Sequence, residues 1–330
     1  MTDTTSKMAI CMKLDGPKAV VIKEMPLQPL KAGEYRIRIR AAALNFPDLL
    51  MTYGKYQFKP ELPFILGMEG AGIIEELQDP DSDFSIGDAV LVKGKTGAFA
   101  EYMTATYAQL AAMPNTLTFE EAAAYSVTYL TAHVSLVDKA RIKPGETVLI
   151  LGAGGGVGQA SVDVAKAKGA TVIAAASSEA KLALAKQSGA DYLINYQTDD
   201  FASEVQKITN NVGADIILDP VGGEYFEKSL DCIAWAGRIL IVGFAGGEFG
   251  VLKTNLPSEK GCSVIGVRAG EFGRRDPAAG RRSFEQLIKL TEENDLKPLI
   301  GKRWPLDQIK EALEAMERRD VIGKQVVTIA

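Results

Sequence analysis

The sequence predicts an α/β protein in which a β-rich lobe precedes a doubly wound parallel sheet. Between about residues 8 and 120, short segments with period-two alternation, such as 35–40 and 89–93, are separated by glycine and proline turns. After residue 120, apolar strands alternate with amphipathic helices, an order that is typical of a parallel sheet covered by helices. The 330 residues are enough for two domains that each bury a core.

The elements of the second domain follow one another at short intervals. A strand at 147–151 leads into a glycine-rich turn, and the helix after it places apolar residues three and four apart. A second helix is expected at 179–188, where it ends at a glycine. Further strands are expected at 171–176, 214–219, 238–243 and 263–267.

The C-terminal part, 281–330, is expected to form two amphipathic helices and a strand at 325–329 that returns to the first lobe. We therefore assign 125–267 to a nucleotide-binding domain, and 1–124 together with 268–330 to a β-rich catalytic domain. Within the second part, 268–277 is expected to be a loop whose arginines either bind an anionic group or solvate the surface.

Composition narrows the class of function. The net charge of -5, with no basic run, argues against nucleic acid as a partner. The polar N-terminal residues carry no apolar signal region, and no stretch approaches the ~18 apolar residues of a membrane span. We therefore expect a soluble, cytoplasmic protein with no membrane partner.

Cysteine and histidine are scarce and scattered. The three cysteines, Cys11, Cys232 and Cys262, are far apart, and His133 is the sole histidine. A zinc site needs three or four clustered ligands, so we expect no metal. The cysteines read as core residues, and His133 lies in a helical pattern where packing is favoured over catalysis.

The glycine-rich turn predicts a Rossmann dinucleotide site. It fits the spacing Ala153-x-Gly155-x-x-Gly158 between a strand and a helix, with alanine in place of the usual first glycine. A glycine at 155 lets the backbone approach a pyrophosphate, which the N–H groups of Gly155, Gly156 and Val157 at the helix start would bind. The alternative is a glycine-rich turn without a ligand.

The end of the second strand favours NADPH over NADH. An NAD site usually places an acid there for the ribose 2′-hydroxyl. Here the strand ends without one, and Ser177 and Lys181 are available to a 2′-phosphate. Glu179 is the opposing observation, although an acid in the first turn after a serine N-cap has a structural explanation. Tyr196 is expected near the adenosine.

Ordered segments through nearly the whole chain carry a family resemblance. Besides the glycine turn, they are ALNFPDLL (43–50), 54–56, LPFILGMEGAG (62–72), 97–102, 128–133, 143–146, 219–223 and 321–324. Together they resemble the medium-chain dehydrogenase/reductase superfamily, specifically its zinc-free NADPH:quinone oxidoreductase (zeta-crystallin-like) branch. This resemblance implies a GroES-like β-rich catalytic domain joined to a Rossmann doubly wound parallel-sheet domain.

The sequence departs from the zinc alcohol dehydrogenases of that superfamily at their metal ligands. Asn45 stands where those enzymes have cysteine, and Met68 where they have histidine before the retained Glu69. Their third ligand falls near Val127, and the four-cysteine lobe is missing. These differences exclude zinc alcohol dehydrogenase chemistry.

The resemblance also implies positions for the remaining site residues. Thr131 resembles the residue beside the nicotinamide ring, and Lys324 a basic residue near the cofactor phosphates. Backbone groups of Val242, Gly243 and Phe244 are expected to meet the carboxamide. The oxygen of a bound acceptor could be held by an amide or phenol group, for which the candidates are Asn45, Tyr53 and Tyr56, although each tyrosine could instead wall the pocket and Asn45 could contact the cofactor.

These observations predict an NADPH-dependent, zinc-independent reductase of quinones or other α,β-unsaturated carbonyl compounds. An enoyl-thioester reductase is an alternative, and so is an NADPH-binding protein with vestigial activity and a sensor or structural role. Related proteins pair sheet edges, so a homodimer through the strand at 263–267 is expected. The physiological acceptor and the choice between one-electron and two-electron reduction stay open.

Overall fold

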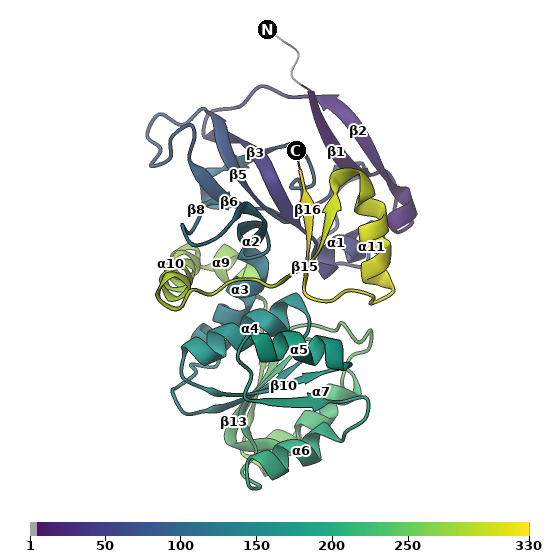
Figure 1. Ribbon diagram of the computed structural model, residues 1–330, viewed down its shortest axis with the longest axis vertical. Helices are drawn as coiled ribbons and strands as arrows, with labels where there is room; N and C mark the ends of the chain where they lie inside the picture. Colours follow the sequence, from purple (N-terminus) through teal and green to yellow (C-terminus); the bar gives the residue numbers. More distant parts are fainter. Residues whose placement is uncertain (1–4, 330) are drawn as a thin grey trace. The chain divides into compact units, whose positions relative to one another are not determined.

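The computed structural model describes residues 5–329, which form two compact units (Figure 1). Unit 1 contains the chain up to Val127 together with the segment from Lys297 onward, and unit 2 runs from Thr128 to Leu296. No helix among the described residues combines the length and the apolar character that a membrane crossing requires.

Unit 1 is built on two β-sheets. In the smaller sheet, β1 (Thr5–Cys11) lies between β2 (Val20–Pro26) and β4 (Phe64–Ile65). The larger sheet has the order β15-β16-β3-β5-β6-β8, and β7 pairs with β3. Its strands are β3 (Glu34–Ala43), β5 (Glu69–Leu77), β6 (Ala89–Lys93), β7 (Tyr102–Thr106), β8 (Leu110–Ala112), β15 (Ile300–Pro305) and β16 (Lys324–Thr328).

The alternation in β3 sets the core of this unit. Tyr35, Ile37 and Ile39 are fully buried, and they pack with apolar residues of β1, β6 and the C-terminal helix α11 (Ile309–Glu317). The period-two pattern therefore correctly predicted the strand, and the structure shows that its apolar positions form the buried face. The short helices α1 (Phe46–Thr52) and α2 (Phe119–Ala123) complete the unit, with 3₁₀ turns at Pro17–Ala19, Tyr107–Gln109 and Leu306–Gln308.

The C-terminal strand returns to the first lobe as predicted. β16 pairs with β3 in antiparallel register, Val327 opposite Ala42, and it pairs with β15 on its other side in parallel. The sequence patterns did not indicate β15. Pairing with β3 brings Lys324, the first residue of β16, beside the end of β3, although the two segments are far apart in the chain.

Unit 2 contains a six-stranded sheet of order β11-β10-β9-β12-β13-β14, with every pair parallel. The chain moves outward from β9 in one direction and then restarts at β12 in the other, so the switch point of a doubly wound sheet lies between these two strands. The strands are β9 (Thr147–Leu151), β10 (Thr171–Ala176), β11 (Tyr192–Asn195), β12 (Ala214–Asp219), β13 (Ile233–Ile241) and β14 (Ser263–Gly266).

Helices flank this sheet, as Figure 1 shows. α4 packs on β9 and β10, and α5 packs on β10 and β11. The helices are α4 (Gly156–Ala167), α5 (Glu179–Gln187), α6 (Phe201–Ile208), α7 (Glu224–Ser229), α8 (Asn255–Lys260), α9 (Ala269–Arg275) and α10 (Pro277–Asn294). Alternating strands and helices therefore form the predicted Rossmann arrangement.

The C-terminal boundary of unit 2 differs from the prediction. Residues 268–296 were assigned to the catalytic domain, but they lie in unit 2, and 269–275 form helix α9 rather than a loop. α9 packs on α10 and on the π-helix Val134–Lys139. The Ser283 hydroxyl of α10 donates to Asp138 at 2.7 Å and lies 3.0 Å from His133 Nδ1. These tertiary contacts have no periodic signal in the sequence.

Candidate active site

The glycine-rich turn joins β9 to α4 in unit 2. A Cβ added to Gly158 would lie 2.3 Å from the carbonyl oxygen of Gly152, so this glycine is required for α4 to pack against the turn. Gly155 is the N-cap of α4 and is exposed, and a Cβ added there would meet only the Gly152 oxygen, at 3.4 Å. Packing therefore explains Gly158, while at Gly155 it leaves room for a ligand to approach the backbone.

The N-terminus of α4 is suited to an anion. Gly156 and Val157, the first two residues of α4, are half-buried, and N–H groups at these positions have no partner within a helix. The N–H of the exposed Gly155, which the sequence also assigned to the pyrophosphate, instead donates to the Gly152 carbonyl at 3.0 Å. The 12-residue length of α4 gives the N–H groups of Gly156 and Val157 the favourable end of a helix dipole. The pyrophosphate of a dinucleotide fits this arrangement.

Lys181 and Ser177 lie together at the start of α5. The ammonium of Lys181 donates to the Ser177 hydroxyl over 3.2 Å, and both residues are half-buried. A Cβ added to Gly154 would lie 2.4 Å from Lys181 Cβ, so the lysine stem rests directly against the glycine turn. The sequence analysis missed this role of Gly154, because only the folded chain brings Lys181 to the turn.

Glu179 and Tyr196 lie near this pair. Glu179 comes two residues before Lys181, and Tyr196 follows β11, the strand that pairs with β10. The Glu179 carboxylate accepts a hydrogen bond of 3.1 Å from Asn195 of β11. The Glu179 carboxylate thus has a partner in β11, which agrees with the structural explanation of this residue as an acid in the first turn of a helix. Tyr196 follows β11, and its ring centroid lies 4.7 Å from that of Tyr225, a packing that leaves it half-buried.

The segment after β13 carries three more of the predicted positions. The N–H groups of Val242 and Gly243 both donate to the Asp219 carbonyl, at 2.9 and 3.4 Å, so the carbonyl oxygens are the backbone groups left for a carboxamide. Phe244 is exposed and packs edge-on against Phe249, with ring centroids 4.7 Å apart. This exposed aromatic pair forms an apolar rim beside the strand ends.

Asp219 closes β12 and holds the loop beside that segment. Its Oδ1 accepts from the N–H groups of Val221 and Gly222, at 2.7 and 2.9 Å. Its Oδ2 is buried without a partner among the described residues, and burial raises the pKa of this carboxyl. A carboxyl in this position orders the loop through backbone hydrogen bonds.

Thr131 lies on α3 (Ser126–His133), which continues into the π-helix. Its carbonyl accepts a hydrogen bond of 2.6 Å from the Ser135 hydroxyl, and its side chain is half-buried. Rare π-helical turns occur often at functional sites. His133 is fully buried and contacts Ser283, in agreement with the packing role favoured by the sequence.

Unit 1 contains a buried polar cluster formed by Asn45, Asp48, Glu69 and Lys324. Asn45 caps α1, and its amide nitrogen donates to Glu69 Oε1 at 2.9 Å and to the Ala43 carbonyl at 3.2 Å. Its amide oxygen accepts from Lys324 Nζ at 2.6 Å. Both amide N–H groups of Asn45 are therefore already in use.

Glu69 and Lys324 form the ion pair of this cluster. Lys324 Nζ lies 2.9 Å from Glu69 Oε1, with 5% of the lysine side chain and none of the glutamate exposed. Glu69 Oε2 accepts from the Val127 N–H at 2.7 Å, so both carboxylate oxygens have partners. These hydrogen bonds offset much of the free energy that is lost when the two charges are removed from water.

Asp48 is the fourth member of the cluster. Its Oδ2 accepts from the Asn45 backbone N–H at 2.9 Å, which closes a capping box at the start of α1. Burial raises the pKa of this carboxyl to about 7. Lys93 of β6 pairs in register with Glu69, and burial lowers its pKa. The cluster therefore combines several ionisable groups away from water.

The structure shows other contacts for three of the predicted site residues. Asn45 has no free amide N–H for an acceptor oxygen, and the Lys324 ammonium is bound to Asn45 and Glu69 rather than free for phosphates. The Tyr53 hydroxyl donates to Glu317 of α11 at 2.5 Å, and this bond raises its pKa to about 12. Tyr56 is half-buried against the unit 1 core. The sequence could not indicate these pairings, because the partners are distant in the chain.

No group of three or more histidine, cysteine, aspartate or glutamate side chains within residues 5–329 is arranged to hold a metal ion. The positions compared with zinc ligands carry Asn45, Met68 and Val127.

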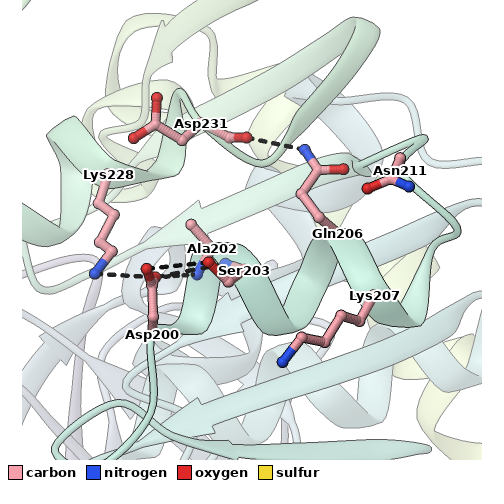
Figure 2. A pocket seen from close by; sticks show the side chains of 8 residues that line it. All are labelled: Asp200, Ala202, Ser203, Gln206, Lys207, Asn211, Lys228 and Asp231. Atoms are coloured by element: carbon pink, nitrogen blue, oxygen red, sulfur yellow. Dashed lines mark hydrogen bonds and ion pairs between the residues drawn. The ribbon is translucent and has the colours of Figure 1, made fainter.

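A hollow of about 360 Å³ lies at the surface of unit 2 beside α6 and α7, as Figure 2 shows. Several of its polar groups already have partners: Lys228 pairs with Asp200 at 3.0 Å, and the Gln206 amide donates to the Asp231 backbone carbonyl at 2.9 Å. We assign no catalytic role to this hollow, because it contains none of the predicted site residues.

Comparisons with known proteins agree with the two-unit architecture. Residues 31–115 match the alcohol dehydrogenase GroES-like domain family, and residues 156–293 match the zinc-binding dehydrogenase family. A quinone oxidoreductase-like protein 2 homolog of Nematostella vectensis is 36% identical over 324 residues, which cover 97% of this chain and 88% of that protein.

Two solved structures are also similar over almost the full length. An NAD-dependent alcohol dehydrogenase is 33% identical with a TM-score of 0.89, over 98% of this chain and 100% of that one. A mycobacterial protein complexed with NADPH is 28% identical with a TM-score of 0.89, over the same shares of the two chains. One of these two relatives is thus named as NAD-dependent, whereas the other was solved with NADPH.

Proposed function

The chain belongs to the quinone oxidoreductase-like proteins of the medium-chain dehydrogenase/reductase superfamily, and from this premise we propose that it is an NADPH-dependent reductase of quinones or other α,β-unsaturated carbonyl compounds. The observation that carries the choice of cofactor is the Lys181–Ser177 pair beside the glycine turn. A cation and a hydroxyl at this point suit a 2′-phosphate, and no carboxylate occupies the tip of β10.

The residues of unit 2 provide the proposed cofactor site. Backbone N–H groups of Gly156 and Val157 would bind the pyrophosphate, with Gly155 leaving room for its approach, while Ser177 and Lys181 would bind the 2′-phosphate. Tyr196 would line the adenosine end. Thr131 and the backbone of Val242, Gly243 and Phe244 would hold the nicotinamide, with Phe249 extending the apolar rim. When bound, the cofactor supplies the hydride.

We propose that the reaction proceeds without zinc. Asn45, Met68 and Val127 provide no thiolate or imidazole ligand, and the Lys324 ammonium already neutralises Glu69. A divalent cation beside this ammonium would be repelled. Catalysis then depends on the orientation of the bound molecules and on hydrogen bonds to the charge that develops on the acceptor oxygen.

The proposal is tested by following NADPH oxidation with 1,2-naphthoquinone, an enal and an enoyl thioester. We expect turnover with the quinone or the enal and a preference for NADPH over NADH. Turnover with the enoyl thioester alone would favour the enoyl-thioester reductase alternative. Tight NADPH binding without consumption across the panel would contradict the reductase and favour a sensor or structural role. Detection of a semiquinone radical by electron paramagnetic resonance would identify one-electron reduction.

We also propose a homodimer. β14 is an edge strand of the sheet in unit 2, and none of its residues is buried. An unpaired strand edge is a template for pairing with a second copy. Sedimentation velocity gives the mass in solution, and a monomer at micromolar concentration would contradict the assignment. A cytoplasmic location remains a prediction of the sequence.

A further inference from the structure

Asp219 holds two loops that follow neighbouring strands of unit 2. Its Oδ1 accepts hydrogen bonds from the N–H groups of Val221 and Gly222, at 2.7 and 2.9 Å, and so fixes the turn after β12. Its backbone carbonyl accepts from the Val242 N–H at 2.9 Å and from the Gly243 N–H at 3.4 Å, at the start of the loop after β13. The conformations of both loops therefore depend on this one residue.

The two loops are also bonded directly to each other. The Ala245 N–H donates to the Pro220 carbonyl at 2.9 Å. The next residue, Gly246, donates its N–H to the Val221 carbonyl at 2.8 Å. A Cβ added to Gly246 would lie 2.8 Å from that same Val221 oxygen, so the backbones touch without space for a side chain between them. A shift of the turn after β12 would therefore displace the loop after β13, because closely packed groups transmit strain.

The loop after β13 carries the acceptors that we assign to the nicotinamide carboxamide. Because the N–H groups of Val242 and Gly243 are bonded to Asp219, the carbonyl oxygens of these two residues are the groups left for the amide N–H bonds of the carboxamide. Asp219 and both loops belong to unit 2. The placement of the two carbonyl oxygens thus follows from contacts within one unit.

We propose that Asp219 is a positioning residue of the cofactor site, which holds the loop after β13 so that the Val242 and Gly243 carbonyls can accept from the nicotinamide carboxamide. The inference rests on the proposed function, because it takes NADPH as the ligand. Asp219 is fully buried, so it acts through the backbone of the two loops and not by contact with the cofactor. Acceptors that are held in place before binding lose little freedom when the ligand arrives, and this raises affinity.

The competing explanation is that Asp219 stabilises unit 2 without any effect on the nicotinamide end. The two explanations can be separated with 2′,5′-ADP, which carries the adenosine and the 2′-phosphate of NADPH but no nicotinamide. Its binding depends on Ser177, Lys181 and the N-terminus of α4. A positioning role predicts that loss of the carboxyl changes the ratio of the two Kd values, whereas a role in stability alone predicts a constant ratio.

The experiment measures the Kd of NADPH and of 2′,5′-ADP by isothermal titration calorimetry. We expect wild type to bind NADPH more tightly than 2′,5′-ADP. For Asp219→Ala we expect the Kd of NADPH to rise by about 10-fold, the value of one hydrogen bond, while that of 2′,5′-ADP changes by less than about 2-fold. Asp219→Asn keeps an oxygen in place of Oδ1 and should recover most of the lost affinity. Asp231→Ala, the same change at an exposed position of unit 2, is the control.

Chemical rescue provides the second measurement. Asp219 lines a hollow of about 80 Å³ together with Phe244, and its Oδ2 is buried there without a partner among the described residues. Truncation to alanine enlarges this hollow by a carboxyl group, so formate can take the place of that group and accept from the Val221 and Gly222 N–H groups. We expect formate to restore NADPH binding to Asp219→Ala in a saturable manner and to leave wild type unchanged. Restoration that is no better with formate than with chloride would overturn the proposal.

Three further results would contradict the role of Asp219. They are a constant ratio of the two Kd values in folded Asp219→Ala, an equal loss of NADPH affinity in Asp219→Asn, and a wild-type protein that binds NADPH no more tightly than 2′,5′-ADP. If Asp219→Ala does not fold, Gly246→Ala replaces it, because its methyl group would press on the Val221 carbonyl from the other loop. We expect the same selective loss of NADPH in Gly246→Ala, and an unchanged ratio there would overturn the proposal.

The two proposals can fail separately. A wild-type protein that binds neither NADPH nor 2′,5′-ADP contradicts the NADPH-dependent function itself. A wild-type protein that binds both ligands, with the same ratio of Kd values in folded Asp219→Ala, contradicts only the role of Asp219.

Discussion

The Lys181 ammonium lies 3.2 Å from the Ser177 hydroxyl, and the stem of the same lysine rests against Gly154 of the glycine turn. The N-terminus of α4, which suits a pyrophosphate, and the pair that suits a 2′-phosphate are therefore joined by direct contact in unit 2. This contact makes the cofactor preference testable at one side chain.

We expect Lys181→Ala to raise the Kd of NADPH by about 10–100-fold, the value of one or two charge-assisted hydrogen bonds, and to leave the Kd of NADH nearly unchanged. Ser177→Asp should go further and favour NADH, because a carboxylate repels the 2′-phosphate and can accept from the 2′-hydroxyl. Titration of the nicotinamide fluorescence measures both constants. Equal weakening of the two cofactors by Lys181→Ala would show that the lysine does not distinguish them.

Two glycines of the turn should respond differently to alanine. In Gly158→Ala the new Cβ would meet the Gly152 oxygen at 2.3 Å, so we expect a loss of stability of about 1–3 kcal/mol, seen as a lower Tm. In Gly155→Ala the added methyl group meets no close protein atom, so we expect a stability cost below about 1 kcal/mol but at least ~10-fold weaker NADPH binding. Thermal unfolding and NADPH titration of both variants check this. A Gly155→Ala protein with wild-type affinity would argue against a pyrophosphate at this turn.

Asp48 should make the stability of the protein depend on pH. Its pKa is raised to about 7 in the folded state by burial, above the usual value of 3.8 for an aspartate. Between these values the unfolded chain releases the proton and the folded chain keeps it, so the free energy of unfolding falls as pH rises toward 7 and then levels off. Asp48→Asn should remove this decline, which we expect to be on the order of 2–4 kcal/mol.

Urea unfolding of wild type and Asp48→Asn between about pH 4 and pH 8 measures the effect of Asp48. Asp320→Asn, which removes an exposed carboxylate from unit 1, is the control for the loss of one negative charge. A constant difference between wild type and Asp48→Asn at every pH would contradict the assignment of the raised pKa to Asp48.

Tyr53 should be dispensable for the reaction. Its hydroxyl is bonded to Glu317, so Tyr53→Phe removes a half-exposed hydrogen bond and no acceptor contact. We expect kcat to change by less than about 2-fold and the free energy of unfolding by about 1 kcal/mol or less. Steady-state kinetics and urea unfolding test this together. A large fall in kcat with unchanged stability would restore Tyr53 as the oxygen donor.

Local patterns in the sequence were sufficient for the architecture. Alternation in 35–40 predicted β3, and the apolar patterns on either side of the Ala153–Gly158 turn predicted the strand and helix that it joins. Such features act over a few residues, since period-two side chains and tight turns leave their mark in adjacent positions. The return of the final strand to the first lobe was also correctly predicted.

Only the tertiary structure decided which distant residues meet. α10 lies with unit 2, and the partners of Asn45 and Tyr53 are Lys324 and Glu317, separated from them by 279 and 264 positions. Strand pairing and helix packing set these contacts, and neither leaves a local periodicity from which a partner can be named. The sequence alone therefore determined the family resemblance, the two folds and the phosphate turn. The pairing of β16 with β3 determined that Lys324 lies in the Asn45–Glu69 cluster, because the register of a sheet fixes which side chains are neighbours across strands.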